Sequence, residues 1–448
     1  MGERLARLRA KGAIVRGIAI ALPLLLWAPW GMASESSSVP ETNPAELLRE
    51  AAAGNPAILA AQARLEAVRH TPSQAEAPAD PEVSVAYTND GLSSFTLGES
   101  EFSVLALNWT QEIRGSRKRR QAGEVASRSA AAAEKEVEQT RLQVLSRVKS
   151  VYAELVRLDQ TAAILAEVRN LLETLEATAR RRYELGEGTQ ESFLKAQTQI
   201  LILEAESIRV SQDRQEAEAR LNAAVGRAPA TPVGPAVIAL RGELPEDVAT
   251  LASSAMMSSP EIGVLQAEVL RFEASAELAR LEEKPDYIWS ASYQYRGELD
   301  PMVMGMFGVR LPLYKARKQA QAVAQAESEL LASRQELANL QISTQSTVRE
   351  LASRVQRSAR LLELYRQGIV PQALTTLESA QASYSLGRVG FLDLLNDLKS
   401  LLEARKDETL WEAERVQSLA ALEPLVGRQL LDAPASGDPA GGGHASLR

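Results

Sequence analysis

Tyr183-Glu184-Leu185-Gly186 recurs 201 residues later as Tyr384-Ser385-Leu386-Gly387, and this repetition decides the fold. Other motif pairs keep the same order at offsets of 200 to 204 residues. These pairs are Asn55-Pro56-Ala57-Ile58 with Ser259-Pro260-Glu261-Ile262, Pro81-Glu82-Val83 with Pro285-Asp286-Tyr287, Arg117-Lys118 with Arg317-Lys318, and Val225-Gly226-Arg227 with Val426-Gly427-Arg428. Chance matches between short motifs do not hold so constant an offset, so the sequence predicts a tandem duplication.

Both repeats predict the same order of elements. A helix of about 25 residues is followed by two short extended segments, and then by a long helix that turns back as a shorter one. The predicted ranges are 44–69, 82–90, 102–112 and 189–225 in the first repeat, and 245–282, 286–296, 303–313 and 391–426 in the second. The first repeat is placed at 34–230 and the second at 231–432.

The long helices are the longest predicted elements. No Gly or Pro occurs between Glu124 and Leu185, and at 1.5 Å per residue this stretch gives a rod of roughly 90 Å. The second repeat predicts a similar helix from Leu313 to Gln367. Apolar residues recur in the first helix at steps of three and four, as in a coiled coil. They are Leu145, Val148, Tyr152, Leu155, Leu158, Ala162, Leu165, Val168, Leu172 and Leu175. Such a rod must pack against other helices along its length.

The predicted strands are amphipathic. Side chains of successive strand residues point to opposite faces, so Tyr287, Trp289, Tyr293 and Tyr295 share one face. Polar residues occupy the other face, and segment 303–313 alternates in the same way. Segment 102–112 alternates less regularly. The pattern is typical of a transmembrane barrel strand, with a soluble sheet packed on helices as the alternative.

A barrel would require several copies of the chain. Four strands cannot close a barrel, and open sheet edges cannot lie in lipid, so the barrel hypothesis demands an oligomer. Three copies would give twelve strands. No segment after the N-terminal region is apolar enough for a membrane helix.

The two ends of the chain differ from the repeats. Five basic residues, an apolar run and Gly31-Met32-Ala33 predict a signal peptide over residues 1–33, with a retained membrane anchor as the alternative. The Pro/Gly/Ser/Ala-rich segment 433–448 predicts a disordered tail.

Composition narrows the possible functions. Cysteine is absent and only two histidines occur, which argues against Cys- or His-based metal sites, thiol catalysis and a Ser-His-Asp triad. No P-loop, dinucleotide-binding turn or HExxH motif is present, so no catalytic site, metal site or cofactor is predicted. The net charge of −8 argues against nucleic acid as a partner.

The duplicated plan, with Tyr-x-x-Gly at each hairpin turn and Leu-x-x-x-Val-Gly-Arg at each end, resembles the TolC family of outer-membrane efflux proteins. The resemblance covers about 44–430. It implies a mainly α chain with short β-strands, which forms a homotrimer with a 12-stranded β-barrel in the outer membrane and an α-barrel in the periplasm. It also implies a periplasmic membrane-fusion adaptor and an inner-membrane pump of the RND or a similar type. The stretch from Tyr384 to Asn396 is similar to the CzcC and CusC heavy-metal branch.

The resemblance also assigns roles to residues at the hairpin tips. It implies that Tyr384, Asp393 and Asn396 gate the pore, although the family has two carboxylates where this chain has Asp393 and Asn396. Ser192 and Lys195 occupy the matching positions of the first repeat, so one carboxylate ring would remain. A solvated residue near a helix N-terminus is the alternative for Asp393. The predicted adaptor-docking residues are Tyr183, Gly186, Gly188, Tyr384, Gly387 and Gly390.

A third set of candidates lies where strands meet lipid and lead into helices. Aromatic side chains favour membrane interfaces, and basic side chains can meet lipid phosphates. The predicted lipid-interface residues are Trp109, Tyr287, Trp289, Arg117, Lys118, Arg317 and Lys318. A solvated basic turn is the alternative for the basic residues. Met302, Met304 and Met306 alternate along one strand, where thioethers could meet soft metal ions or simply pack.

The sequence therefore favours a passive exit duct of an efflux system, located in the outer membrane with a large periplasmic part. A periplasmic coiled-coil adaptor or scaffold protein is the alternative. An adaptor would carry one hairpin, however, whereas this chain predicts two hairpins and two strand pairs. An enzyme ranks third.

Overall fold

A computed structural model of the protein describes residues 41–92, 94–244 and 247–433. The predicted signal peptide lies outside the described residues, as does the predicted tail apart from Ala433. The described elements of the first repeat are α1 (Pro44–Gly54), α2 (Pro56–Arg69), α3 (Thr71–Glu76), β1 (Glu82–Thr88), β2 (Val104–Ile113), α4 (Ser116–Glu184) and α5 (Gln190–Val225).

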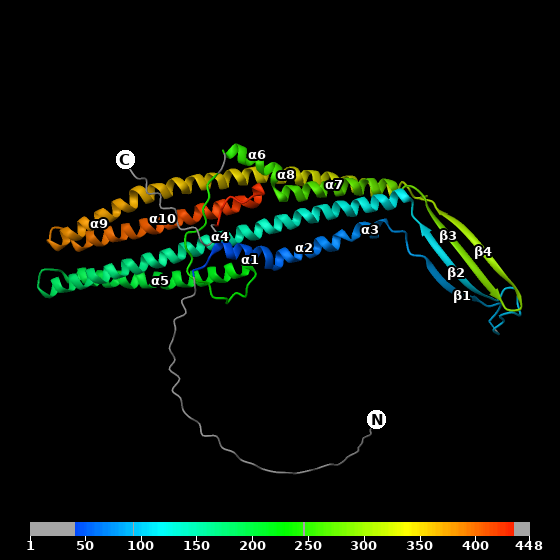
Figure 1. The fold of residues 1–448 in the computed structure, drawn as a ribbon, viewed down its shortest axis with the longest axis horizontal. Coiled ribbons are helices and arrows are strands. Elements are labelled where there is room, and N and C mark those ends of the chain that lie inside the picture. Colours follow the sequence, from blue (N-terminus) through cyan, green and yellow to red (C-terminus); the bar gives the residue numbers. More distant parts are fainter. Residues whose placement is uncertain (1–40, 93, 245–246, 434–448) are drawn as a thin grey trace, which may run out of the picture. The chain divides into compact units, whose positions relative to one another are not determined.

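The second repeat has the same order of elements, with one interruption. Its elements are α6 (Val248–Ser258), α7 (Pro260–Leu281), β3 (Asp286–Arg296), β4 (Leu299–Arg310), α8 (Gln319–Leu364), the π-helical turn η1 (Tyr365–Ile369), α9 (Val370–Ser385) and α10 (Phe391–Val426). Figure 1 shows the four strands side by side and the helical hairpins α4–α5 and α9–α10. Among the described residues, none of the helices combines the length and apolarity needed to span a membrane.

The first helix of each repeat is broken, which corrects the single helices predicted for 44–69 and 245–282. Asn55 and Ser259 adopt extended backbone angles, and a new helix starts at Pro56 and Pro260. A proline ring disfavours helical angles in the preceding residue, so each helix must restart there. The Asn55 side chain caps the second helix by accepting a hydrogen bond from Ala57 N at 2.8 Å.

The long helix of the second repeat also differs from the prediction. It begins at Gln319 rather than near Leu313, and at Tyr365 it widens into a π-helical turn. The Val370 N–H then bonds to the Tyr365 carbonyl, five residues back. Pro371 has no N–H to donate to Gln367, so the regular α-helical bonding cannot continue through this point. The wider turn absorbs the break and lets α9 continue the helix.

The four strands form one antiparallel sheet in the order β1-β2-β3-β4, so the pairing of β2 with β3 joins the two repeats. Strands β1 and β4 are its edges. Nearly every residue of these two strands is exposed, whereas β2 and β3 alternate between covered and exposed residues. Among the described residues, neither edge has a partner strand.

The register brings most exposed apolar side chains of the four strands onto one face, whereas Met302, Met304 and Met306 of β4 lie on the other. Trp109 lies opposite Val83 and Ala291, and Trp289 lies opposite Phe307. The alternation predicted for 286–296 is therefore confirmed, and that predicted for 303–313 is confirmed as far as Arg310, where β4 ends. Phe102, which broke the predicted pattern of the first repeat, lies before the first residue of β2. The apolar face comprises Val83, Val85, Tyr87, Leu105, Leu107, Trp109, Tyr287, Trp289, Tyr293, Tyr295, Val303, Phe307 and Val309.

The hydrophobic core follows the long helices. Helix α4 packs against α5 and α2 of its own repeat and against α7 and α10 of the second repeat. The predicted seam of α4 is buried except for Ala162, which is exposed. Thr161 is buried in its place, and its hydroxyl donates to the Arg157 carbonyl at 2.7 Å.

Candidate functional site

The two hairpin tips end their first helices in the same way. Gly186 and Gly387 have φ angles of 75° and 72°, a left-handed conformation that glycine adopts at no steric cost. The next residue closes each turn, since Glu187 N donates to Arg182 O at 2.8 Å and Arg388 N donates to Ser383 O at 2.9 Å. These are the backbone bonds of a Schellman helix end. The repeated Tyr-x-x-Gly motif therefore specifies both turns.

Arg182 joins the two tips. Its Nη1 donates to the Tyr384 carbonyl oxygen at 2.7 Å, and its guanidinium carbon lies 4.9 Å from the centre of the Tyr384 ring. The tips enclose a cleft of about 450 Å³. Its lining includes Gly188, Ser192, Tyr384, Gly387, Gly390 and Asp393. The structure thus brings most of the predicted tip and gate residues together, but Tyr183, Gly186 and Asn396 do not line this cleft.

The tyrosines of the two tips have different surroundings. Tyr384 is 8% exposed and packs edge-on against Phe391, with ring centres 5.9 Å apart. Tyr183 is 43% exposed and meets Phe193 at 5.4 Å. Burial between Arg182 and Phe391 makes the Tyr384 ring part of the packing of the second tip. Its backbone carbonyl is the group that contacts the first tip.

Asp393 lies in the first turn of α10, where the helix dipole favours a negative charge. It is exposed, and it forms no ion pair with the residues that the structure describes. Glu187 and Glu191 line the same cleft. The Lys195 ammonium bonds to the Glu191 carboxylate at 2.6 Å and lowers its pKa. Asp393 is thus a carboxylate available to an ion or to another chain.

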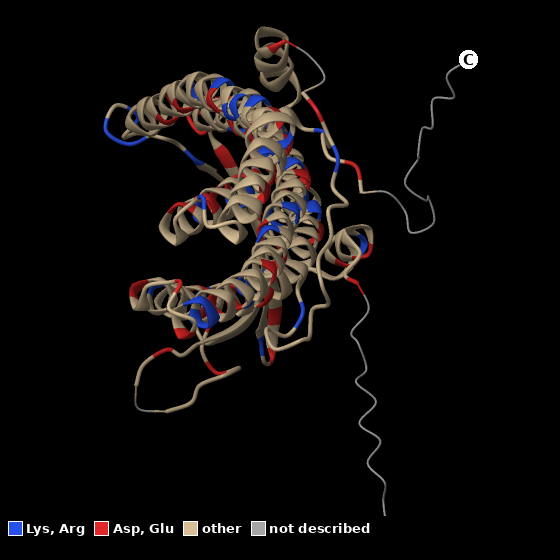
Figure 2. Cartoon of the chain, turned by 90° about the vertical axis from the view of Figure 1, so that its left-hand side faces the viewer, with Lys and Arg blue, Asp and Glu red and all other residues tan. Residues whose placement is uncertain are grey.

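Charges elsewhere on the helices are mixed rather than segregated. Figure 2 shows Lys and Arg interspersed with Asp and Glu over the helices. Many of these residues pair along one helix, for example Arg169 with Glu173 at 3.0 Å. Exposed pairs of this kind contribute little stability, and they mark a solvated surface.

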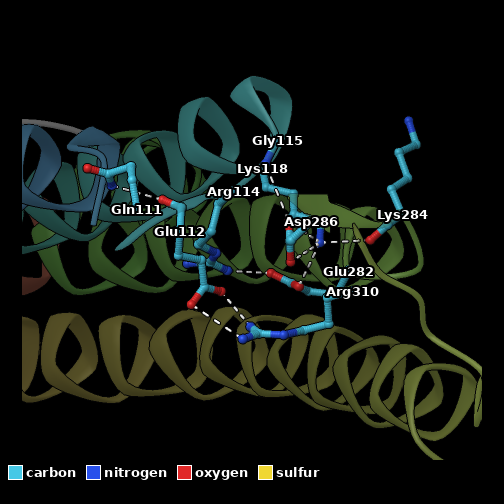
Figure 3. Close-up of polar contacts among 9 residues, drawn as sticks. All are labelled: Gln111, Glu112, Arg114, Gly115, Lys118, Glu282, Lys284, Asp286 and Arg310. Carbon is cyan, nitrogen blue, oxygen red and sulfur yellow. Dashed lines mark hydrogen bonds and ion pairs between the residues drawn. The ribbon is translucent and has the colours of Figure 1, made fainter. Parts of the chain in front are cut away.

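Lys118 is buried, so its prediction as a lipid-interface residue is wrong. It is 2% exposed, and its ammonium lies 2.9 Å from both carboxylate oxygens of Asp286 and 3.2 Å from Glu282. It also donates to the Lys284 carbonyl at 2.9 Å (Figure 3). A buried lysine needs such partners because an unpaired charge in the interior is strongly destabilising. Lys118 therefore holds the end of β2 to the start of β3.

The other predicted lipid-interface residues are exposed. Trp109, Tyr287 and Trp289 lie on the apolar face of the sheet, and Arg117, Arg317 and Lys318 lie at the strand-to-helix junctions. Sequence reasoning missed Asp286, Glu282 and Arg182. The repeat gave a signal for Asp286, because Glu82 holds the matching position as a second carboxylate at the start of a strand.

Binding of a metal ion requires a cluster of ligating side chains. Among the described residues, no group of three or more His, Cys, Asp or Glu side chains could hold a metal ion. Met302, Met304 and Met306 lie opposite Gln294, Ser292 and Ser290, on the more polar face of the sheet.

A family model described as outer membrane efflux protein matches residues 47–227 and 251–428, one segment in each repeat. The chain belongs to the outer membrane efflux protein family. Its resemblance to TolC-type channels, its function as an efflux channel and its location in the outer membrane are thereby confirmed. No curated protein matches this efflux protein.

Solved structures with the same fold include VceC from Vibrio cholerae. It is 21% identical with a TM-score of 0.73, over 86% of this chain and 96% of VceC. CmeC from Campylobacter jejuni is 13% identical with a TM-score of 0.74, over 91% and 94% of the two chains. CusC is 13% identical with a TM-score of 0.73, over 88% and 97%. The efflux protein is therefore mainly helical with a few strands, as predicted.

Proposed function

We propose that three copies of this efflux protein assemble into a passive duct, in which their strands close a 12-stranded barrel in the outer membrane. The observation that carries the proposal is the four-stranded sheet with two open edges and one exposed apolar face. An open edge cannot lie in lipid with its backbone groups unpaired, so each edge needs a strand from another copy. The long hairpins would continue the duct through the periplasm.

The faces of the sheet suit this arrangement. The apolar face carries Trp109, Tyr287 and Trp289, and Trp289 is 50% exposed in the single chain. In a barrel this face would meet lipid, with aromatic rings near the membrane interface. The opposite face carries Asn108, Ser290, Ser292 and Gln294, which would line a water-filled channel. The polar face therefore supports a conduit rather than a sealed barrel.

The hairpin tips would carry the gate and dock the other components. The cleft holds Asp393 beside Gly387 and Gly390, and Tyr183 and Gly186 lie at the tip of the first hairpin. The tips would receive a periplasmic membrane-fusion adaptor, which links the duct to an inner-membrane pump of the RND or a similar type. In the trimer, three Asp393 carboxylates near one axis would attract cations and repel anions. Exported heavy-metal cations would suit such a ring.

The assembly is tested by fractionation and planar-bilayer recording of the purified protein. We expect the full chain in the outer-membrane fraction, as a trimer that resists mild detergent and conducts ions. Its channels should conduct without any added energy source, because transport is driven elsewhere. A soluble periplasmic monomer would contradict the proposal and favour the adaptor or scaffold alternative.

The gate is tested by Asp393→Asn, which removes the charge and keeps the shape. We expect a loss of block by divalent cations and a change in single-channel conductance, because the carboxylate ring would be gone. Ser192→Ala at the first tip is the matched control and should leave both unchanged. If Asp393→Asn channels are indistinguishable from the unaltered channels, Asp393 is a solvated helix residue and not a gate.

A further inference from the structure

The two strand pairs of the chain have the same register at equivalent residues. Glu82 pairs with Thr110 in the first repeat, and Asp286 pairs with Arg310 in the second. These partners are related by the same offsets that relate the sequence motifs, 204 residues for β1 and β3 and 200 for β2 and β4. The seam between β2 and β3 is therefore a template for any further seam between repeats.

Within the described residues of a single chain, the β2–β3 pairing is the one such seam. Strand β2 of the first repeat pairs with β3 of the second, but β4 and β1 remain as edges. Trp109 lies opposite Ala291 in the internal seam. The equivalent positions at the edges are Val309 and Tyr87, and both point to the apolar face. A shift of one residue between β4 and β1 would place apolar side chains beside polar ones. The register of the β2–β3 seam is therefore the one that keeps one face of the sheet apolar and the other polar.

The internal seam carries a buried ion pair at its helical end. Lys118 follows β2, Asp286 opens β3, and the ammonium lies 2.9 Å from both carboxylate oxygens (Figure 3). The backbone N–H of Gly115 also donates to Asp286 at 3.3 Å. We call this arrangement the internal clamp. It fixes the start of α4 against the neighbouring repeat.

The same charges stand at the open edges without partners. Lys318 is equivalent to Lys118, and Glu82 is equivalent to Asp286. Both are exposed, and neither side chain forms an ion pair with the residues that the structure describes. Helix α8 also begins three residues later than α4 does at its equivalent position, so a hydrogen-bonded turn replaces the first helical residues at this junction.

Helix α8 also lacks, along its length, the contacts with the other repeat that α4 makes. Within the described part of the chain, α8 contacts α6, α7, η1 and α10, all from its own repeat. Helix α4 additionally contacts α7 and α10 across the repeats, and their first-repeat equivalents are α2 and α5. Leu142 of α4 is 6% exposed, whereas its equivalent Ile342 on α8 is 70% exposed. One face of α8 therefore lacks the cover that its counterpart has.

Polar contacts across the repeats give the same indication. Gln121 donates to the Ala274 carbonyl at 2.9 Å, and Ser146 donates to the Ala420 carbonyl at 2.6 Å. The equivalent positions on α8 hold the same residue types, Gln321 and Ser346, and both side chains are exposed. The sequence thus keeps these donors on α8, where neither forms a hydrogen bond to a described residue.

We infer that a neighbouring copy covers this face by repeating the internal seam, so that β4 pairs with β1 of that copy, Val309 lies opposite its Tyr87, and Lys318 forms an ion pair with its Glu82. The partner is a second copy of this chain, since only β1, α2 and α5 of the first repeat complete the template. The inference rests on the proposed assembly and adds its register and its clamp.

The register is tested by disulfide crosslinking, for which the natural absence of cysteine gives a clean background. The double variant Val309→Cys/Tyr87→Cys should join copies through reducible bonds when membranes are treated with a mild oxidant. Directly opposed strand residues have the short Cβ separation that a disulfide needs. Val309→Cys/Val83→Cys, displaced by four residues on the same face, should not crosslink. Crosslinking of the displaced pair instead would overturn the inferred register.

The clamp is tested by charge reversal. Lys318→Glu should lower the temperature at which the oligomer dissociates in detergent, and adding Glu82→Lys should restore it. The matched internal variant is Lys118→Glu, which should impair folding within each chain because a buried carboxylate would then face Asp286, Glu282 and the Lys284 carbonyl. Asp286→Lys should not rescue Lys318→Glu. If Glu82→Lys does not rescue Lys318→Glu in a protein that still folds, the inferred ion pair is wrong.

These outcomes separate the inference from the proposed function. A conducting outer-membrane trimer with the displaced crosslink, or without charge rescue, would leave the function standing and overturn the seam. A monomer that never reaches the outer membrane would overturn both.

Discussion

The two long helices of this protein differ although they occupy equivalent places in the two repeats. Helix α4 runs without interruption from Ser116 to Glu184, whereas its counterpart is divided into α8, the π-helical turn η1 and α9. Among the elements that the structure describes, α4 packs against both repeats, and α8 packs against its own alone. Two equivalent units thus differ in their long helix, which is continuous and covered by both repeats in the first copy and contains a π-helical turn in the second.

The π-helical turn has its own polar anchors. The Tyr365 hydroxyl bonds to the Asp407 carboxylate at 2.9 Å, and this hydrogen bond raises the pKa of Tyr365. Arg366 bonds to Glu408 at 2.9 Å and lies 3.5 Å from Glu412. These contacts hold the π-helical turn against α10. π-helical turns often occur at functional positions, so we expect the second hairpin to carry the movement that the proposed gate at the tips requires.

The largest expected effect comes from a substitution at Lys149 of α4, which forms an ion pair with α10. Its ammonium lies 2.7 Å from the Glu423 carboxylate, and both side chains are buried. We expect Lys149→Met to destabilise the fold by about 3–5 kcal/mol, because the Glu423 charge would remain buried without its partner. Urea unfolding followed by circular dichroism measures this loss.

The controls separate the buried pair from a general loss of charge. Lys399→Met removes an exposed lysine of the second hairpin and should change the stability by less than about 0.5 kcal/mol. Lys149→Met/Glu423→Gln should recover much of the lost stability, since the amide oxygen can still accept from Leu430 N and Leu431 N. Equal losses in Lys149→Met and Lys399→Met would show that the buried ion pair does not stabilise the packing of α4 on α10.

The sequence predicted those features that depend on residues close together in the chain. Gly186 and Gly387 marked both hairpin turns, because glycine tolerates the left-handed angle that ends a helix. The breaks before Pro56 and Pro260 were missed, although the prolines were visible, because the apolar pattern continues through them. The burial of Lys118 could not be predicted, since Asp286 lies 168 residues further along the chain. A long-range partner is set by the packing of the repeats, which a local pattern does not contain.

A smaller effect is expected at the link between the tips. Arg182→Met removes the bond to the Tyr384 carbonyl and the contact with the Tyr384 ring. A hydrogen bond from a charged donor contributes about 1.5 kcal/mol or more, so the tips should separate more easily. Bilayer recording should show a higher open probability. Arg181→Met, which alters the exposed neighbour, should not change it. If both variants behave alike, the two hairpins are not coupled through Arg182.

The smallest effect concerns the π-helical turn itself. Gly368→Ala adds a methyl group that would meet only the Leu364 side chain at ordinary contact distance, 3.8 Å. Alanine favours helical backbone over glycine by about 0.5–1 kcal/mol, so the turn should stiffen and the channel should open less often. Gly263→Ala in α7 is the matched control, because its added methyl would also make only an ordinary contact, 3.6 Å from Lys135. Both variants should be slightly more stable than the unaltered protein. Only Gly368→Ala should lower the open probability, since Gly368 lies in the π-helical turn and Gly263 does not. A similar decrease in Gly263→Ala would mean that overall stability, rather than the π-helical turn of the second hairpin, controls opening.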